Sequence, residues 1–429
     1  MLRLPVNSSI RKSEFARNAI TLTLGTSVAQ IIPILFYPVL SRIFLPSDFG
    51  LLATITSITS ILTVLSTGKY ESCILIASSK QNAANVIGLV LSLGLPFLTI
   101  SYLVLQTFSV NLGNWLSQPD LYKWIFICPI SALSIVIFSC YNEWCVRNKY
   151  FVSLAWNKII NSTAISVSKL LLGIIHVFSN GLVFGDLIGR MISATGCIIR
   201  AIFKDKPEFM KISLSQMKII AIRYHEFPKL YLPAQLLNTV GVSFPVFLIG
   251  AYFNSNEVGF YAMTMSVLSM PLTIISSSIR DTFRQRANEE IVKKGNCRET
   301  YIRLLKILTI AGFSGCAIII YFMPDLFSFF LGEKWRTAGE YSQILLPMMT
   351  IDFVAMSLSG ILIIREKLGI SLLWQLYYVF ITLISLIAGF LLFADIRSTL
   401  ICFSIGRGSA YLLQIIISNR YSKGKAQNV

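Results

Sequence analysis

Long apolar runs separated by short polar stretches dominate the pattern of this chain. Within the runs, apolar residues follow one another without the two-residue alternation of a half-buried strand. Each run is about 20 residues long, the length at which an α-helix crosses the hydrocarbon core of a bilayer. The pattern therefore predicts twelve transmembrane helices, near residues 18–41, 49–67, 85–108, 122–142, 154–177, 182–203, 230–252, 258–279, 303–324, 341–364, 370–393 and 398–418.

The composition agrees with a membrane protein. The chain is 55% hydrophobic and only 13% charged, whereas a soluble domain carries about 25% charged residues. In lipid, only helices and closed barrels satisfy every backbone polar group. A barrel would need alternating strands of about 10 residues, and the apolar runs here are longer and do not alternate. The predicted fold class is therefore an all-α polytopic membrane protein.

The distribution of basic residues predicts the orientation. If both termini lie in the cytoplasm, the opposite side carries five of the 37 Lys and Arg residues, and four more lie inside spans. The remaining 28 (37 less nine) are then cytoplasmic, as the positive-inside rule requires. The net charge of +17 is mostly a topology signal. Because no soluble basic domain is present, nucleic-acid binding is not expected.

Two cytoplasmic stretches are longer than a tight turn. Residues 204–225 have apolar positions at helical spacing with basic residues between them, which predicts an amphipathic linker helix at the membrane surface. In the second stretch, Glu289 and Glu290 precede Lys293 and Lys294 by four residues, a spacing that stabilises a solvated helix. The predicted organisation is a lobe at 14–203, the linker at 204–225, a second lobe at 226–418 and a tail at 419–429.

Several short phrases occur twice in the same order. "FLPSDFGLLA" at 44–53 matches "FNSNEVGFYA" at 253–262, "EFAR" at 14–17 matches "EFPK" at 226–229, and "IGR" occurs at 188–190 and again at 405–407. An ordered series of this kind favours duplication of a six-helix unit. Since six is even, both copies have the same topology and are related by a pseudo-two-fold axis along the membrane normal, with a binding site between them.

Charged residues inside the spans are the candidate functional residues. A basic residue at mid-span costs about 2.5–3.5 kcal/mol and so needs a partner, water or a function. Arg190 has Asp186 one turn earlier, so a structural ion pair is one interpretation. Arg407 has no acid in its own helix and could reach Asp352 only across helices. Because the repeat places the two arginines at equivalent positions, we favour a shared cationic cavity.

Two lysines extend this hypothesis. Lys158 and Lys169 are three helical turns apart and share one face of the fifth span, which suits a water-filled lumen. For Lys158 the alternative is that its side chain snorkels to the cytoplasmic edge. Glu71 and Asp281 stand beside basic residues at the ends of the second and eighth spans. The candidate ion-coupling residues or charge partners are thus Asp186, Asp352, Glu71 and Asp281.

No cofactor or metal is expected. The eight cysteines have no paired spacing and mostly lie in apolar runs, where they read as small core residues. His176 and His225 are the only histidines, which gives little support to a metal site. The predicted protein therefore works without a cofactor.

The repeat and its local phrases resemble the Wzx-type flippases of O-antigen and other polysaccharides. These belong to the superfamily that also contains multidrug exporters and the lipid II flippase. The stretches that carry the resemblance are "TLTLGTSVAQIIPILFYPVLSRIFLPSDFGLLA", "STGKYESCILI" and "FLIGAYFNSNEVGFYAMTMSVLSMPLTIISSSI". The resemblance implies a MATE-like fold of two six-helix lobes around a cavity that opens alternately to each side. It also implies a bacterial inner-membrane location and an undecaprenyl-diphosphate-linked glycan as substrate.

The anionic headgroup of such a substrate suits the charged residues above, because guanidinium groups bind phosphate with two parallel hydrogen bonds. Arg190, Arg407, Lys169 and Lys158 are therefore the candidate substrate-binding residues. A polysaccharide polymerase and a chain-length regulator are candidate protein partners, besides membrane lipid.

Two other classes of function remain open. A multidrug exporter of the same superfamily often has an acidic residue in its first span, as the resemblance implies, and none lies between Arg17 and Arg42 here. A membrane enzyme, such as a polysaccharide polymerase or acyltransferase, would need a large outer loop or a membrane histidine beside an acid. Neither is present, so the sequence predicts a transporter.

Overall fold

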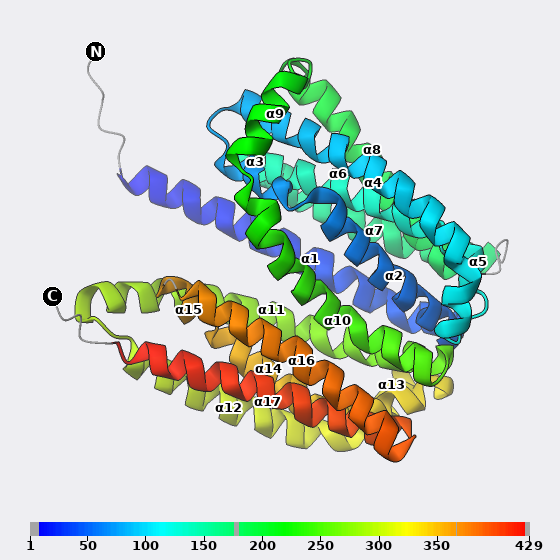
Figure 1. Ribbon diagram of the computed structural model, residues 1–429. Helices are drawn as coiled ribbons and strands as arrows, with labels where there is room; N and C mark the ends of the chain where they lie inside the picture. The colour runs from blue at the N-terminus through cyan, green and yellow to red at the C-terminus, as the bar shows by residue number, and fades with distance from the viewer. Residues whose placement is uncertain (1–7, 176–179, 366, 425–429) are drawn as a thin grey trace, which may run out of the picture. The chain divides into compact units, whose positions relative to one another are not determined.

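The computed structural model describes residues 8–175, 180–365 and 367–424, which are helical except at short turns. Within this part of the chain, twelve helices are long and apolar enough to cross a membrane, which confirms the predicted fold class. Figure 1 shows them as α1 (Ser8–Ile43), α2 (Pro46–Thr67), α4 (Lys80–Trp115), α6 (Ile127–Arg147), α7 (Phe151–Ile175), α8 (Gly181–Phe209), α10 (Leu232–Tyr252), α11 (Ser255–Lys294), α12 (Arg298–Ile319), α14 (Arg336–Leu358), α16 (Leu368–Phe393) and α17 (Ile396–Ser422).

Shorter helical segments occupy the connections between the spans. They are η1 (Tyr70–Ser72), α3 (Cys73–Ile76), α5 (Leu121–Trp124), α9 (Leu214–Arg223), η2 (Phe227–Tyr231), η3 (Ile320–Phe322), α13 (Met323–Leu331), η4 (Glu333–Trp335) and α15 (Ile361–Ile364). The longest span, α11, continues without a break into the stretch that the sequence predicts to be solvated.

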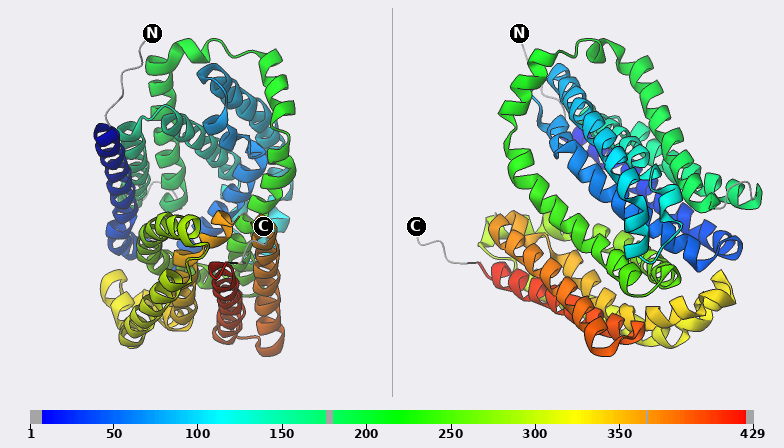
Figure 2. Two further views of the ribbon diagram at one scale, coloured as in Figure 1. Left: turned by 90° about the vertical axis from the view of Figure 1, so that its left-hand side faces the viewer. Right: turned by 45° about the vertical axis from the view of Figure 1, so that its right-hand side comes forward.

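The helices group into two compact units. The first consists of Met1–Phe44, Ile55–Leu112 and Asp120–Leu236, and the second of Leu45–Thr54, Gly113–Pro119 and Leu237–Val429. Two further views show that the long helices of each unit run side by side (Figure 2). The units follow the two predicted lobes only in part. The first unit includes the stretch predicted to be a linker and the start of the predicted second lobe, up to Leu236, and the second unit takes up two short segments of the predicted first lobe.

The predicted linker, 204–225, contains the end of α8, up to Phe209, and α9, which packs against the core of the first unit. Met217 and Ile220 are buried, whereas Ile219 and Ile222 on the other side are 55% and 65% exposed. A helix with one docked face and one exposed apolar face suits a membrane surface. The helix that the amphipathic pattern of this segment predicts is therefore present in the structure.

Glycines bring α7 and α8 into backbone contact. A methyl group on Gly185 would lie 2.6 Å from the Cα of Lys169, and one on Gly189 would lie 2.3 Å from the Cα of Ile165. Small residues at four-residue spacing allow such close approach between membrane helices. The contact fixes the register of the two helices and sets Lys169 beside α8.

The repeated phrase has a structural explanation within the second unit. It forms the start of α2 in one copy and the start of α11 in the other. A methyl group on Gly50 would lie 2.0 Å from the carbonyl oxygen of Ser255, and one on Gly259 would lie 1.8 Å from the carbonyl oxygen of Pro46. Ser255 and Pro46 occupy the same position in the two phrases. Each copy therefore supplies the glycine that admits the first turn of the other copy.

Close packing in the second unit recurs between α16 and α17. A methyl group on Gly406 would lie 2.6 Å from the Cβ of Ser385. At the other end of the unit, the buried ring of Trp335 makes edge contacts with Phe49 and Phe260, with centroids 5.1 and 6.0 Å apart. The contact at Gly406 holds α17, and with it Arg407, against α16.

Candidate functional site

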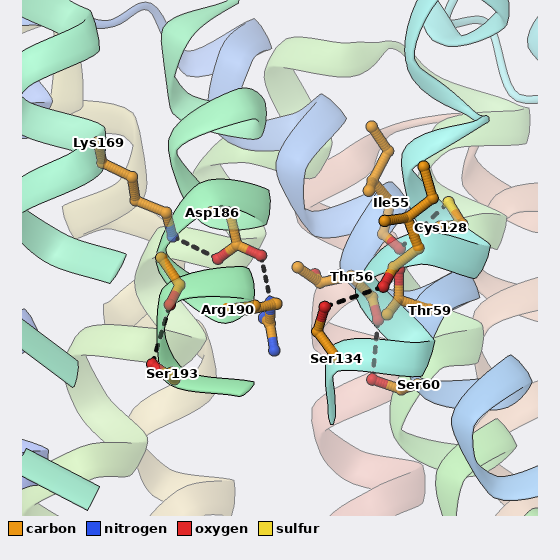
Figure 3. A network of polar contacts seen from close by, with 12 residues as sticks. Ile55, Thr56, Thr59, Ser60, Cys128, Ser134, Lys169, Asp186, Arg190 and Ser193 are labelled. Carbon is orange, nitrogen blue, oxygen red and sulfur yellow. Dashed lines mark hydrogen bonds and ion pairs between the residues drawn. The ribbon is translucent and has the colours of Figure 1, made fainter. Parts of the chain in front are cut away.

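In the first unit, Lys169 and Arg190 share one carboxylate, that of Asp186. The Nζ atom of Lys169 lies 2.8 Å from one oxygen of Asp186, and the Nε atom of Arg190 lies 2.5 Å from the other. Figure 3 shows the three side chains, with Lys169 reaching Asp186 from α7 and Arg190 reaching it from α8. We call these residues the triad.

The triad carries one unit of excess positive charge inside a membrane-spanning region. Its side chains are 14% (Lys169), 8% (Asp186) and 22% (Arg190) exposed, so the acid is the most enclosed member. A buried ion pair is stable only if its geometry compensates for the lost hydration. Here one acid faces two bases, so the group as a whole attracts an anion. The ion pair suggested for Arg190 is therefore present, and the cationic cavity shared with Arg407 stays a prediction.

Arg190 keeps hydrogen-bond donors for another partner. A guanidinium has five N–H donors, and the bond to Asp186 uses the one on Nε. In the view of Figure 3, its terminal nitrogens lie between α8 and the hydroxyl-bearing side chains of Thr56 on α2 and Ser134 on α6. Terminal nitrogens at that place are suited to a bidentate oxyanion.

Lys158 lies on α7 but contacts a different helix. Its Nζ donates to Oγ1 of Thr26 on α1, 3.0 Å away. The carboxylate of Glu143 on α6 also acts on it electrostatically. Lys158 is half-buried rather than fully exposed, and it is not part of the triad. Glu143 does not stand out in the sequence, because it lies just beyond the predicted end of the fourth span.

In the second unit, Arg407 lies in a cage of aromatic rings. Its side chain is buried, and its Nε donates to the hydroxyl of Tyr411 at 3.1 Å. The guanidinium carbon lies 4.8 Å from the ring centre of Tyr378, 5.5 Å from that of Phe403 and 5.9 Å from that of Tyr411. A cation over aromatic faces is stabilised by about 2 kcal/mol when it is desolvated. The aromatic rings thus replace part of the stabilisation that hydration would otherwise give to the guanidinium.

Asp352 on α14 belongs to the same cluster. Arg407 acts on its carboxylate electrostatically, as the sequence analysis proposed for a contact across helices. Its Oδ1 atom is buried without a hydrogen-bond partner. Phe403 and Tyr411 stand four residues before and after Arg407, so helical spacing in the sequence already places both rings beside it. Tyr378 lies on another helix, α16, and has no such signal in the sequence.

Glu71 and Asp281 differ in their surroundings. Glu71 pairs with Lys69 at 3.0 Å and its side chain is 11% exposed. Asp281 lies 4.0 Å from Arg280 and is 74% exposed. Only Glu71 is therefore placed among buried groups, and one of its oxygens is buried without a hydrogen-bond partner.

In the described parts of the chain, no three His, Cys, Asp or Glu side chains gather closely enough to hold a metal ion. The cysteines are free thiols, seven of them buried.

Comparison with solved structures identifies the fold. The chain is similar to an inward-facing multidrug resistance MATE family transporter of the MOP superfamily, with a TM-score of 0.62, 15% identity and 94% of each chain covered. It is also similar to the lipid II flippase MurJ in an inward closed conformation, with a TM-score of 0.70, 10% identity, and 94% of this chain and 87% of that one covered. The expected MATE-like fold is therefore confirmed.

A third similar structure is a MOP superfamily transporter from Pyrococcus furiosus, described by the reverse polarity of its binding pocket, which suggests a different function. Its TM-score is 0.63, with 14% identity, and 94% of this chain and 95% of that one are covered. A comparison with curated proteins gives no match. A family model described as "Polysaccharide biosynthesis protein" matches residues 39–340, more than half of the chain.

Proposed function

Because the chain belongs to the polysaccharide biosynthesis protein family, we propose that it is a flippase for undecaprenyl-diphosphate-linked oligosaccharide repeat units. It moves them from the cytoplasmic to the periplasmic face of the bacterial inner membrane by alternating access. The family match and the fold support a transporter of polysaccharide precursors rather than an enzyme. The glycan is that of O-antigen or a similar surface polysaccharide, and both termini lie in the cytoplasm.

The observation that carries this proposal is the excess positive charge of the triad. A diphosphate headgroup bears fixed negative charge that must cross a medium of low dielectric constant. Charge-assisted hydrogen bonds from Arg and Lys are about twice as strong as neutral ones. Asp186 holds Lys169 and Arg190 in place, and the free donors of Arg190 face the side chains of α2 and α6. We therefore assign the first contact with the diphosphate to Arg190, with Lys169 as its neighbour.

Arg407 has a later role in this mechanism. In the described conformation its guanidinium is enclosed by Tyr378, Phe403 and Tyr411. It can therefore reach an anionic headgroup only after these rings move apart. We propose that such a movement accompanies opening of the second unit. We also propose that Lys158, near the start of α7, binds the substrate. A polysaccharide polymerase and a chain-length regulator act on the translocated units.

A multidrug exporter is the second candidate, because one of the structures with a similar fold is a multidrug resistance transporter. The two candidates differ in the charge they require. An exporter of cationic drugs needs an acidic site, whereas the triad has one more base than acid. The charge of the triad therefore favours an anionic substrate.

The test is genetic. In a bacterium that carries this gene, deletion should remove the surface polysaccharide while the lipid-linked repeat unit accumulates on the cytoplasmic leaflet. The wild-type gene should restore export, and a gene carrying Arg190→Gln should not, at equal protein abundance. Normal polysaccharide together with increased sensitivity to cationic drugs would instead identify an exporter.

A further inference from the structure

The hairpin between α11 and α12 is held firmly at one end of the second unit. Gly295 ends α11 with φ 75°, a conformation that favours glycine. The carbonyl oxygen of Gly295 accepts a bond of 2.7 Å from Arg365, and the backbone N–H of Cys297 donates to Ser422 at 3.0 Å. Below the turn, Phe283 of α11 is buried in the same cluster as Tyr301 of α12. The two helix surfaces thus keep a fixed relation to each other.

A hollow of about 380 Å³ lies between the two helices. Its lining contains two arginines, three hydroxyl side chains and three apolar side chains, and no carboxylate. We call it the hairpin hollow. The residues that line it are Ser278, Ile279, Thr282, Phe283 and Arg286 of α11, and Thr300, Arg303 and Leu304 of α12.

A second hollow adjoins the first at Arg303, which lines both. It contains three basic residues and one acid, and its lining residues are Asn296, Arg298, Glu299, Ile302, Arg303 and Lys306. The hairpin hollow is therefore one part of a larger basic surface, and Arg303 stands at its centre.

Glutamates orient the two arginines of the hairpin hollow without using up their donors. The Nε atom of Arg286 lies 3.3 Å from an oxygen of Glu290, and that same oxygen accepts a bond of 2.6 Å from Thr300. Nη2 of Arg303 lies 3.1 Å from Glu299. Each guanidinium has five N–H donors, so both can still bind an oxyanion. Their side chains are 64% exposed, which leaves them accessible to a ligand.

Exposed apolar side chains continue from the hollow toward the middle of both spans. On α11, Ile275 lies one turn from Ile279 and is 50% exposed. On α12, Ile307 lies one turn beyond Leu304 and Ile310 one turn beyond Ile307, and they are 54% and 70% exposed. A ligand whose anionic group lies between the arginines would therefore extend its remaining part along an apolar surface. This is the shape of a lipid.

We propose that the hairpin hollow binds the phosphate headgroup of an anionic phospholipid from the cytoplasmic leaflet. Arg286 and Arg303 hold the phosphate, and the acyl chains follow the isoleucines. The hydroxyls of Ser278, Thr282 and Thr300 donate within the protein, so their oxygens act as acceptors toward the headgroup. Basic pockets between membrane helices on the cytoplasmic side are suited to such headgroups. The site is separate from the triad, and it does not depend on the identity of the transported substrate.

The test compares two double variants with the same loss of charge. Arg286→Gln/Arg303→Gln removes both arginines of the hollow, whereas Lys293→Gln/Lys294→Gln removes two exposed cations from the same hairpin. Binding of phosphatidylglycerol to each full-length protein, purified in a neutral detergent, is measured by native mass spectrometry. We expect the arginine variant to bind about 10-fold or more weakly, since each basic residue near anionic lipid contributes about 1 kcal/mol. The lysine variant should stay within about threefold of wild type.

Three further measurements distinguish specific binding in the hairpin hollow from non-specific electrostatic attraction and from binding of the transported lipid. Arg286→Lys/Arg303→Lys keeps the charge but loses the bidentate geometry, and should fall between wild type and the glutamine variant. Phosphatidylcholine should bind the wild type at least 10-fold more weakly than phosphatidylglycerol. Equal losses in the two glutamine variants would overturn the proposal, as would equal binding of the two lipids. Displacement of phosphatidylglycerol by a polyprenyl diphosphate at much lower concentration would assign the hollow to the substrate instead. A melting curve for each variant confirms that it is folded.

Discussion

Arg190 and Arg407 occupy the same place in the two copies of the repeat but have opposite surroundings. Each follows a glycine that packs against the preceding long helix, Gly189 against α7 and Gly406 against α16. Four residues before each arginine, the first copy has Asp186 and the second has Phe403. The helix geometry has been retained while the means of stabilising the cation has changed.

Other positions near the two arginines also differ in the kind of side chain that faces the cation. Four residues after the arginine, the first copy has Ala194 and the second has Tyr411. At the 217-residue offset of the two "IGR" phrases, the residue that corresponds to Lys169 is Leu386, which is buried. One unit thus stabilises its arginine with a carboxylate and adds a second cation, while the other surrounds it with aromatic faces. The comparison teaches that a duplicated membrane site can keep its cation while aromatic rings replace the charged partner. This is possible because ring faces and a carboxylate both offset the cost of removing the cation from water.

Replacement of Asp186 should have the largest effect. Asp186→Asn leaves Lys169 and Arg190 facing each other without a carboxylate between them. Breaking a buried charge pair costs about 3–5 kcal/mol, so the melting temperature in detergent should fall steeply and export should be lost. The double variant Asp186→Asn/Arg190→Gln removes one cation as well and should recover part of the stability. A wild-type melting curve for Asp186→Asn would show that the triad is not an ionic structure.

The shared helix geometry can be tested with matched glycine variants. Gly189→Val and Gly406→Val both place a side chain against the neighbouring helix, where overpacking costs about 3 kcal/mol at its upper end. We expect similar losses of stability in both, measured by thermal unfolding. Gly196→Val is the control, because a methyl group there meets nothing within 4 Å. If only one of the two arginine-adjacent variants is destabilised, the two helix pairs are not equivalent.

The aromatic cage should tolerate loss of its cation better than the triad tolerates loss of its acid. Arg407→Met fills much of the same volume and removes an interaction of about 2 kcal/mol, so the protein should remain folded and abundant. Export should nevertheless fall by at least 10-fold if Arg407 binds the headgroup. Normal export by Arg407→Met, with Arg407→Lys as the charge-retaining reference, would limit Arg407 to a structural role.

Much of this comparison could be predicted from the sequence. Spans of about 20 apolar residues were sufficient for the fold class. The orientation drawn from the 37 basic residues and the equivalence of the two arginines drawn from the "IGR" phrases stay predictions. Hydrophobicity and charge act locally along the chain, so they can be read without knowing which helices touch. Gly181, Gly185 and Gly189 have the four-residue spacing of a close helix contact, but that spacing does not say which helix provides it.

The partners across helices could not be predicted. Lys169 reaches Asp186 only because Gly185 lets α7 approach α8, and the ring of Tyr378 reaches Arg407 from a different helix. Glu290 was expected to pair with Lys294, four residues later, but it contacts Arg286 and Thr300 instead. That sequence-based interpretation of Glu290 was incomplete, because a basic residue one turn earlier and a neighbouring helix compete for the same carboxylate.

The smallest expected effects concern single hydroxyl groups, one at a cation of each unit. Tyr411→Phe keeps the ring over Arg407 but removes the oxygen that accepts its Nε–H, and Thr26→Val removes the oxygen that accepts from Lys158. A hydrogen bond to a charged group contributes about 1.5–3 kcal/mol, and partial compensation lowers the net loss toward about 1 kcal/mol. The loss should be larger for Tyr411→Phe, because Arg407 is buried whereas Lys158 is half-buried and can turn to other polar groups. Thermal unfolding of the two variants side by side measures this difference. An equal or larger loss for Thr26→Val would mean that burial does not set the size of the loss. A melting curve for Tyr411→Phe equal to that of wild type would mean that the rings alone stabilise Arg407, and that the second unit needs no hydroxyl to hold its cation.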